Sequence, residues 1–316
     1  MPITSVRALR RSGILGMNRR NIDYIARYNE RSLYPLVDDK LRTKKLAEKH
    51  LLPTPRLQAV LDTQHALKGL SERVSGLSGF AVKPAKGAGG KGILVITDRE
   101  RERFIKASGA SLSLPDLARH CSNILAGLYS LSGVPDVALI EDLIEPEPYF
   151  NKLSIEGVPD IRVIIFRGVP VMAMLRLATH ASDGKANLHQ GAIGVGLDLT
   201  TGAGVHAVQF SRRIHTQPDT GAALDHILIP DWQQLLTLAA RCHELTGLGY
   251  LGADLVVDRN RGPLMLELNA RPGLAIQVAN GCGLLPRLRR VEAIEDIPAE
   301  PESRVALAME LFGSNS

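Results

Sequence analysis

Residues 252–269 constrain the chain more than any other segment. They have the pattern of two apolar strands joined by a polar, glycine-containing turn. An antiparallel register centred on that turn pairs Asp258 with Pro263 and Asp254 with Glu267. One face of this hairpin then carries only aliphatic side chains, namely Ala253, Leu255, Val257, Leu264, Leu266 and Leu268.

The opposite face of the hairpin carries Asp254, Asp258, Glu267 and Asn269. Residues directly opposite each other have Cβ atoms about 5 Å apart, and like charges at that spacing repel. A bound cation removes the repulsion, and oxygen ligands of this kind suit Mg²⁺, with Mn²⁺ as a substitute. A solvent-exposed polar face explains the hairpin pattern equally well when the hairpin is taken alone.

A glycine-rich loop at 86–92 lies between two expected strands, 79–84 and 93–96. Its seven residues include two lysines and the glycines Gly87, Gly89, Gly90 and Gly92. A strand–loop–strand unit of this kind can lay backbone N–H groups over phosphates, because glycine permits close approach. Lys83 ends the first strand and supplies a positive charge to the same region. The alternative is an ordinary flexible hairpin turn.

Two better-known phosphate loops do not fit this segment. A dinucleotide-binding fingerprint needs a following helix and an acid about 20 residues on, whereas a β-branched strand follows Gly92 here. The Walker pattern requires Lys and then Ser or Thr after its last glycine, and Ile93 stands there instead.

The composition is that of a globular protein, with 45% apolar and 22% charged residues among 316. The net charge of +5 favours acidic partners, but 4% aromatic residues argue against a nucleic-acid-binding module. Arginines gather at both ends of the chain, where solvated charge is a simpler explanation than a polyanion site. These arginines are Arg7, Arg10, Arg11, Arg19, Arg20, Arg287, Arg289 and Arg290.

The three cysteines, Cys121, Cys242 and Cys282, lack metal-binding or paired spacing. They fit structural roles in a reducing compartment. No run of about 18 apolar residues predicts a membrane span, and the segment after Arg10 and Arg11 is too short for the apolar core of an export signal. We therefore expect a cytoplasmic protein.

The expected elements combine helices with strands that are mostly joined as hairpins, which favours an α+β fold over a doubly wound parallel sheet. The Asp38–Asp39 pair predicts a helix start before 40–50, and Asp231 predicts the start of a helix that ends at Gly247. Further predictions are a helix at 63–74, a helical segment at 99–132 broken near 111–115, strands at 137–142, 160–166 and 169–177, and a polar glycine-rich segment at 180–204.

Three features occur in order along the chain: a basic helix start, a lysine with a glycine-rich cover, and a hairpin of two acids and an asparagine. This arrangement resembles the ATP-grasp superfamily, specifically the RimK-like α-L-glutamate ligases and the bacterial α-L-glutamate ligase-related proteins. The resemblance spans about 38–283. Its most specific segments are 39–44, 82–84, 187–191 and 262–274.

The resemblance implies two α+β lobes that clasp ATP, preceded by a short N-terminal extension. The implied division is an extension at 1–37, an N-terminal lobe at 38–139, a C-terminal lobe at 140–290 and a peripheral tail at 291–316. Relatives usually carry a longer N-terminal domain. They also have His-Arg-Gly-Gly at 189–192 and Ala-Ser-Pro-Gly at 270–273, where this chain differs at positions that a substrate could contact.

The resemblance also implies a role for each candidate residue. The implied nucleotide ligands are Lys40, Lys83, the loop glycines, the adenine-contacting hinge of Glu141, Asp142, Leu143 and Ile144, and Glu147 at the ribose. The implied Mg²⁺ ligands are Asp254, Glu267 and Asn269. The implied residues around the γ-phosphate and acyl phosphate are Arg162, Arg176 and Asn187. His189 could take a proton from the amine, and Arg271 could bind a carboxylate.

The implied reaction is ligation of a carboxylate to an amine through an acyl phosphate, with glutamate as a possible added amino acid. The acceptor could be an amino acid, an acidic peptide or a polymer, and a homo-oligomer could form through 99–132. Two alternatives remain at this point. One is a phosphotransferase that stops at a phosphorylated product, and the other is a nucleotide-binding sensor without catalysis.

Overall fold

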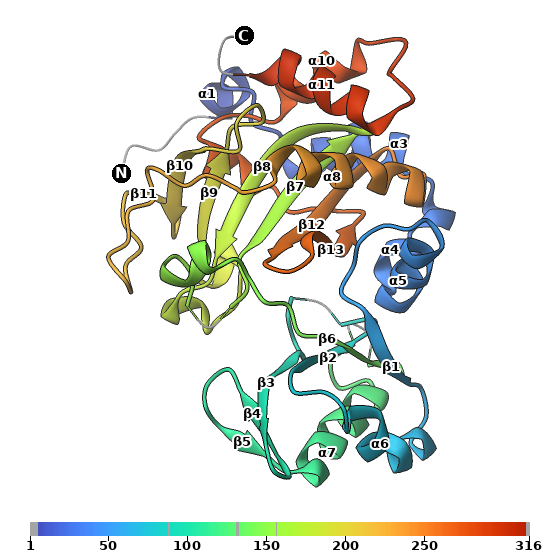
Figure 1. The fold of residues 1–316 in the computed structure, drawn as a ribbon. Coiled ribbons are helices and arrows are strands. Elements are labelled where there is room, and N and C mark those ends of the chain that lie inside the picture. Colours follow the sequence, from blue (N-terminus) through green and yellow to red (C-terminus); the bar gives the residue numbers. More distant parts are fainter. Residues whose placement is uncertain (1–5, 88, 131–132, 156, 314–316) are drawn as a thin grey trace. The chain divides into compact units, whose positions relative to one another are not determined.

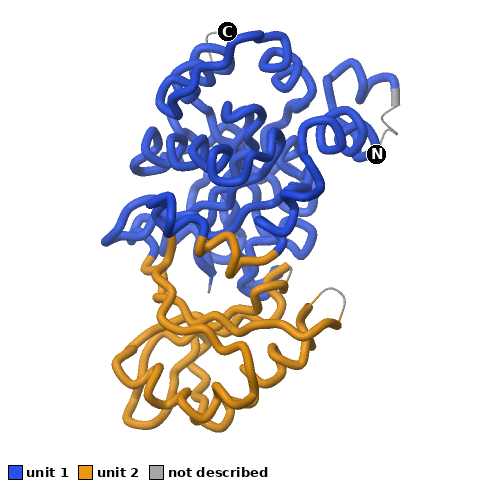
Figure 2. Tube along the Cα trace, turned by 90° about the vertical axis from the view of Figure 1, so that its right-hand side faces the viewer, with its two compact units in different colours: residues 1–38, 46–53, 146–316 blue, residues 39–45, 54–145 orange. Residues whose placement is uncertain are grey.

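The computed structural model describes residues 6–87, 89–130, 133–155 and 157–313, and its chain divides into two compact units. Ala88 of the glycine-rich loop lies outside the described residues. Unit 1 contains residues 1–38, 46–53 and 146–316, and unit 2 contains residues 39–45 and 54–145 (Figures 1 and 2). In the described part of the chain, no helix is both long and apolar enough to cross a membrane.

Unit 2 is built on a six-stranded sheet with the strand order β1-β6-β2-β3-β4-β5, and every neighbouring pair is antiparallel. Its strands are β1 (Leu57–Leu61), β2 (Phe80–Pro84), β3 (Leu94–Glu100), β4 (Arg103–Lys106), β5 (Ser111–Leu112) and β6 (Ala138–Asp142). Its helical elements are η3 (His65–Gly69), α6 (Leu70–Val74), α7 (Leu114–Leu125) and the first part of α5 (Lys40–Lys49).

The two faces of this sheet differ in chemistry because side chains alternate along each strand. Phe80, Val82 and Ile140 point to one face and join a core with residues of α6 and α7. Lys83 and Glu141 point to the other face. Ala81 is paired with Glu141, so these two side chains share a face, and Lys83 shares it too because it lies two residues after Ala81 on β2. The sheet therefore keeps a charged face apart from its hydrophobic core.

Unit 1 is built on a seven-stranded antiparallel sheet with the strand order β11-β10-β9-β8-β7-β12-β13. The strands are β7 (Asp160–Phe166), β8 (Val169–Leu177), β9 (Ile193–Leu197), β10 (Gly204–Gln209), β11 (Arg212–Ile214), β12 (Tyr250–Asp258) and β13 (Gly262–Asn269). Its longer helices are α8 (Trp232–Thr246), α10 (Leu285–Glu292) and α11 (Pro301–Phe312). Its shorter helical elements are α1 (Val6–Arg11), α2 (Met17–Arg19), the π-helix η1 (Arg20–Ile25), α3 (Ala26–Tyr28), η2 (Arg31–Leu33), α4 (Pro35–Asp38), η4 (Pro148–Lys152), η5 (His180–Ser182), η6 (Leu188–Gln190) and α9 (Ile276–Asn280).

The hairpin β12–β13 has the predicted pairing of Asp254 with Glu267, but a bulge follows it. Asp258 is therefore paired with Gly262, and the predicted pairing with Pro263 is wrong. A bulge places an extra residue in one strand and shifts every later partner by one. The buried aliphatic face accordingly includes Met265 instead of the predicted Leu264 and Leu266.

Each face of the seven-stranded sheet is covered by different segments. Helix α8 packs on the aliphatic face, where its Cys242 contacts Met265. Helix α9 packs on the other face near the sheet glycines. A Cβ atom on Gly196 would lie 2.5 Å from the Ala279 carbonyl oxygen, so glycine is needed for this approach. The rings of Tyr24 and Tyr28 cover the same face at Phe166.

Two expected segments fold differently from the prediction. Residues 99–112 contain the end of β3, the strands β4 and β5 and the turns between them, instead of a helix. Helix α7 begins only after Ser113, which caps it with Asp116 in a capping box. The glycine-rich segment 180–204 contains the buried strand β9. Glycines alternate with its apolar residues, so the sequence pattern did not indicate a strand. The predicted hairpin β7–β8 and the predicted end of α8 at Gly247 agree with the structure.

The compact units also divide the chain differently from the expected four parts. Strand β6 runs through Asp142 as part of the first sheet, and the boundary follows Glu145. The expected extension at 1–37 belongs to unit 1. The expected peripheral tail contains α11, which buries Val305, Ala308 and Phe312 in the core of unit 1. An amphipathic helix is stabilised by such burial, so this helix is not peripheral.

Gln277 ties the N-terminal segment to the rest of unit 1. Its buried side chain accepts hydrogen bonds from the backbone N–H groups of Leu15 (2.8 Å) and Leu284 (2.9 Å) and donates to the Leu15 carbonyl (3.1 Å). Gln277→Ala leaves two buried donors without an acceptor, so we expect a loss of about 2–4 kcal/mol in the free energy of unfolding. Urea denaturation measures this loss. The matched control Gln234→Ala, on the exposed side of α8, should change stability by less than about 0.5 kcal/mol.

Candidate functional site

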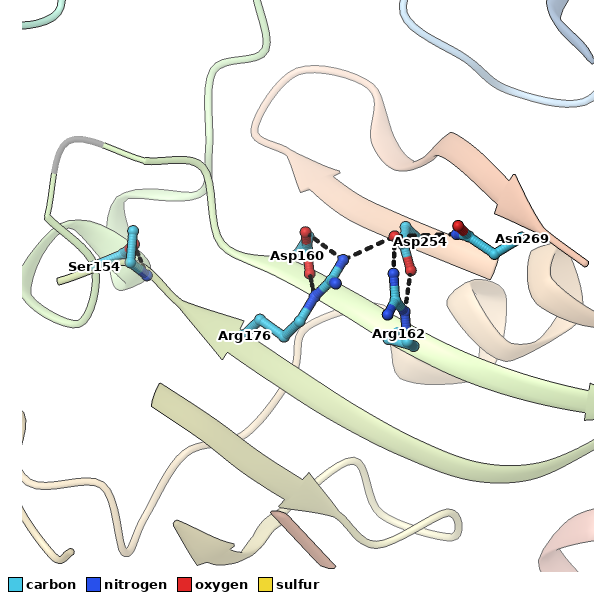
Figure 3. Close-up of polar contacts among 7 residues, drawn as sticks. Ser154, Asp160, Arg162, Arg176, Asp254 and Asn269 are labelled. Atoms are coloured by element: carbon cyan, nitrogen blue, oxygen red, sulfur yellow. Dashed lines mark hydrogen bonds and ion pairs between the residues drawn. The ribbon is translucent and has the colours of Figure 1, made fainter. Parts of the chain in front are cut away.

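Four charged side chains form one network on the face of the seven-stranded sheet opposite α8 (Figure 3). The Arg162 guanidinium donates two hydrogen bonds to the Asp254 carboxylate, from Nε to Oδ1 at 2.7 Å and from Nη2 to Oδ2 at 2.5 Å. Arg176 makes a two-point contact with Asp160, and its Nη2 also lies 2.8 Å from Oδ2 of Asp254. Asp254 thus connects two arginines from neighbouring strands.

Strand register explains why these residues meet. Arg162 is the direct partner of Asp254 across β7 and β12, and Asp160 is the direct partner of Arg176 across β7 and β8. Residues two apart on β7 share one face. The sequence Asp-Ile-Arg at 160–162 therefore places an acid and a base side by side, next to opposite charges on both neighbouring strands.

Burial makes the charges in this network strongly interdependent. Burial raises the pKa of the Asp254 carboxyl, but the adjacent Arg162 and Arg176 outweigh it and hold that pKa below its usual range. Burial lowers the pKa of Arg176, but the two carboxylates of Asp160 and Asp254 raise it above its usual value. Asp254 is therefore an anion and Arg176 a cation in the folded protein.

The three predicted metal ligands lie on one face of the hairpin β12–β13. Asp254 is directly opposite Glu267, and Asn269 is two residues further along. The Asn269 side-chain amide donates to Oδ2 of Asp254 at 3.4 Å. Among the described residues, no group of three or more His, Cys, Asp or Glu side chains gathers as a metal centre. Two carboxylates and an amide oxygen nevertheless fit a Mg²⁺ ion whose other ligands are waters and phosphates.

The other residues predicted for the reacting end of the substrate have local partners. The Asn187 side-chain oxygen accepts a hydrogen bond from the His189 backbone N–H at 3.0 Å, at the start of η6. His189 itself is exposed. The Arg271 guanidinium lies over the ring of Tyr34, 4.9 Å from its centroid, so it packs on the loop rim as a cation–π pair.

A second charged cluster lies in unit 2. The buried Glu141 carboxylate is held between Lys44 and Lys83, with 2.8 Å from each lysine Nζ to the nearer carboxylate oxygen. Lys44 also donates to the Pro55 carbonyl. Burial raises the pKa of Glu141, but Lys83 and Lys44 together lower it below its ordinary value. The Glu141 side chain, predicted to belong to an adenine-contacting hinge, is thus paired with the lysine predicted to hold phosphates.

The glycine-rich loop follows β2, as predicted. Gly89, Gly90 and Gly92 have left-handed backbone conformations, with φ of +64°, +75° and +76°. A Cβ atom on Gly92 would lie 2.5 Å from the Tyr129 ring, so both conformation and space require glycine there. The Lys40 Nζ donates to the carbonyl of Gly87 at 2.7 Å. This bond brings the predicted Lys40 and the loop together.

The remaining predicted hinge residues continue from β6. The Asp142 side chain accepts a hydrogen bond from Gln58 on β1. Leu143 and Ile144 are half-buried, and Leu143 packs against Gly79. Glu147 precedes η4, and its backbone N–H donates to the Val257 carbonyl at 3.4 Å.

Two functional candidates were missed by sequence reasoning. Asp160 lies within the predicted strand 160–166 and Lys44 within the segment 39–44, but neither was assigned a role. The signal for Asp160 was its two-residue spacing from Arg162 on a predicted strand. The signal for Lys44 was its i, i+4 spacing from Lys40, which places both lysines on one side of α5. Cys282, expected to be structural, is exposed, whereas Cys121 and Cys242 are buried.

The Glu141 cluster yields a stability prediction. Glu141→Gln leaves two lysines near a neutral amide, one of them almost fully buried, so we expect a loss of about 3–5 kcal/mol in the free energy of unfolding. Lys44→Met keeps the pair of Glu141 with Lys83 and should lose less. Urea denaturation of both variants at pH 7 tests the order. Equal losses would show that Lys83 does not support the carboxylate.

The same cluster predicts a pH dependence. Because the folded protein lowers the Glu141 pKa below its ordinary 4.5, the stability that Glu141 contributes is present above pH 4.5 and is lost as the pH falls further. The difference in unfolding free energy between the native protein and Glu141→Gln should therefore shrink between about pH 5 and pH 3. A constant difference would contradict a lowered pKa.

The match to a family model agrees with this architecture. The family model for sugar-transfer associated ATP-grasp proteins matches residues 19–293. No curated protein sequence matches the chain. Solved structures of similar fold include the ATP-grasp ligase PsnB in complex with a precursor variant, Mg and ADP (14% identity, TM-score 0.44, 88% of this chain and 61% of that chain). A second is the D-cycloserine synthetase DcsG (16% identity, TM-score 0.47, 89% of this chain and 72% of that chain). A third is D-alanyl-alanine synthetase A from Vibrio cholerae (10% identity, TM-score 0.48, 90% of this chain and 67% of that chain).

The chain thus spans about three fifths of the length of PsnB. The predicted α+β architecture with the ATP-grasp fold is confirmed by two antiparallel sheets with flanking helices and by the family match. The narrower resemblance to RimK-like α-L-glutamate ligases stays a prediction. Because the matching model covers most of the sequence, the chain belongs to the sugar-transfer associated ATP-grasp family.

Proposed function

We propose that this protein is an ATP- and Mg²⁺-dependent ligase that joins a carboxylate to an amine through an acyl phosphate. The observation that carries the proposal is the position of Asp254, directly opposite Glu267 and in contact with both Arg162 and Arg176. A site of this kind contains metal ligands and phosphate-binding cations but no activated nucleophile. Those are the groups that phosphoryl transfer requires, because its catalysis rests on positioning and charge neutralisation.

Asp254, Glu267 and Asn269 are the proposed Mg²⁺ ligands, and Mn²⁺ could take the same place. When bound, the metal would neutralise charge on the phosphate oxygens. In the protein alone, the two arginines satisfy the Asp254 carboxylate. Arginine binds phosphate as readily as carboxylate. We therefore expect Arg162 and Arg176 to contact the transferred phosphoryl group when substrate is present.

In unit 2, Lys40, Lys83 and the glycines of the loop are the proposed phosphate contacts. Glycine N–H groups can approach phosphate oxygens closely, and each lysine supplies a point charge. The backbone of 141–144 and the Glu147 carboxylate are the proposed contacts for adenine and ribose. Glu141 keeps Lys83 oriented, because its carboxylate accepts the Lys83 hydrogen bond at 2.8 Å.

In the proposed first step, a carboxylate oxygen of the substrate attacks the γ-phosphorus of ATP, and the bond to the bridging oxygen of ADP breaks. In the second step, an amine nitrogen attacks the acyl carbon, and inorganic phosphate leaves as the amide forms. Arg162 and Arg176 stabilise negative charge in both steps. The amine must lose a proton, which His189 or solvent could accept.

The identity of the two substrates is a narrower proposal. The resemblance to RimK-like proteins favours glutamate as the added amino acid. The family description associates its members with sugar transfer, so an acceptor attached to a saccharide belongs in the same test as amino acids and acidic peptides. Arg271, on the exposed loop over Tyr34, is the proposed contact for a substrate carboxylate.

Removal of one metal-ligand charge tests the site. We expect Glu267→Gln to lower Mg²⁺-dependent ATP turnover by about 10²–10³-fold, because a preorganised charge-stabilising group is lost. Lys83→Ala should have a similar effect, and both variants should keep the native circular dichroism spectrum. Glu302→Gln makes the same chemical change on exposed α11 and should leave turnover unchanged. Full activity in Glu267→Gln would refute the metal assignment.

Product analysis tests the reaction itself. Purified protein with Mg·ATP and a pool of amino acids, acidic peptides and saccharide-linked amines should release ADP and phosphate. Intact-mass detection should find a product heavier than its acceptor by one amino acid less water. A phosphorylated product without an amide would instead establish the phosphotransferase alternative. ATP binding without turnover in any pool would favour the sensor alternative.

A further inference from the structure

The net positive charge of this protein lies in its first 37 residues. They contain seven arginines, no lysine, one aspartate and one glutamate, for a net charge of +5. The net charge of the whole chain is also +5, so residues 38–316 are neutral in sum. A dispersed, solvated surface charge would not give this distribution. The N-terminal segment therefore requires an explanation of its own.

The fold joins this segment to the second arginine group of the sequence, on α10. The Leu285 N–H donates to the Gly13 carbonyl at 3.1 Å, and Pro286 packs directly on Gly13. Arg27 forms an ion pair with Glu292 at 3.1 Å. Figure 1 shows α1 beside the C-terminal helices of unit 1. Two clusters separated by more than 250 residues in the sequence thus form one region.

The electrostatics of Tyr24 support the same juxtaposition. Burial raises the pKa of the Tyr24 hydroxyl above its usual value, the carboxylates of Glu292 and Asp23 raise it further, and the positive charges of Arg19 and Arg289 oppose that shift. Both guanidinium groups therefore act on one hydroxyl, although Arg19 lies at the end of α2 and Arg289 lies on α10.

We define the arginine surface as the exposed Arg7, Arg10, Arg11, Arg19, Arg27, Arg289 and Arg290. The three arginines of α1 are spaced i, i+3 and i+4, so they share one side of that helix. On α10, Leu285, Leu288 and Val291 are buried, which leaves Arg289 and Arg290 on the outer side. Arg19 and Arg27 pair with Asp23 and Glu292, and the other five arginines add five positive charges.

The N-terminal segment also carries exposed aliphatic side chains. Leu9 is 42% exposed, Met17 is 65% exposed and Ile22 is 69% exposed. All three come from the same N-terminal segment as five of the arginines. Basic residues combined with exposed aliphatic side chains are the composition of a segment that rests on an anionic bilayer, with the aliphatic groups in the headgroup boundary.

The aromatic pattern argues against a nucleic acid as the partner. Single-stranded nucleic acid is bound through exposed aromatic rings on which bases stack. In this region Tyr24 is buried and Tyr28 is half-buried against Phe166. A soluble acidic polymer would be bound by the arginines alone and would gain nothing from Met17 and Ile22. The exposed aliphatic side chains therefore favour a lipid surface.

We propose that the arginine surface binds the protein peripherally to an anionic lipid bilayer. The charge on this surface faces the negative headgroups, and Met17 and Ile22 enter the boundary between headgroups and acyl chains. This proposal goes beyond the proposed ligase activity and does not depend on it. It uses none of the residues assigned to the nucleotide or the metal.

Sedimentation with vesicles tests the proposal on the full chain. The native protein should bind vesicles of phosphatidylcholine containing 30% phosphatidylglycerol at 100 mM NaCl, and should bind pure phosphatidylcholine at least about 10-fold less. The triple variant Arg7→Gln/Arg10→Gln/Arg11→Gln should lower the partition coefficient by roughly 100-fold, because each basic residue contributes to attraction near an anionic surface. The matched control Arg101→Gln/Arg212→Gln/Arg213→Gln removes the same charge from exposed positions elsewhere and should bind like the native protein.

A second variant separates a lipid surface from a soluble polyanion. Met17→Ser/Ile22→Ser keeps every charge and should lower vesicle binding by at least about 5-fold without changing binding to poly-glutamate. Equal losses in the two arginine triple variants would overturn the proposal, because general charge would then explain binding. Binding to poly-glutamate or RNA with no binding to anionic vesicles would also overturn it. Thermal unfolding should show the same transition for all variants.

Discussion

The sheet of unit 1 depends on how the carboxylate of Asp254 is compensated. This carboxylate is almost completely buried, and an isolated buried carboxylate would be strongly disfavoured. Arg162 and Arg176 compensate it, and Arg176 is in turn compensated by Asp160. Because each charge needs its neighbours, the three strands β8, β7 and β12 must keep one register. A shift of one strand by one residue would turn that strand's members of the network to the opposite face, away from their partners.

The same face shows how the sheet positions chemistry beside a hydrophobic core. The strands that carry Arg162 and Asp254 bury Ile161, Val163 and Leu255 on their other side. Strand glycines then permit the segment that follows β13 to pack over the charged face, as at Gly196. The side chains of this polar site are anchored by their partners and its backbone by the core, which preorganises the site.

The sequence allowed the pairing of Asp254 with Glu267, the β7–β8 hairpin and the glycine-rich loop to be predicted, because turn residues and strand alternation determine them locally. It did not reveal the bulge after Asp254, since a bulge depends on how the paired strands meet. It also did not reveal β9, because the glycines of this strand are explained by the packing of α9 on them. Lys44 and Asp160 became visible as partners only when strands and helices distant in sequence were brought together.

The N-terminal segment combines two requirements that are usually satisfied by different parts of a protein. Its inward side chains complete the core of unit 1, since Leu15, Tyr24 and Ile25 are buried there and Asn29 binds the backbone of Tyr250. Its outward side chains include six of the seven arginines of residues 1–37, a segment whose net charge equals that of the whole chain. Charge that served only to keep the protein dispersed could lie anywhere on the surface. Its concentration on a segment that is anchored by buried contacts gives a charged surface of defined shape, which is what a specific anionic partner needs.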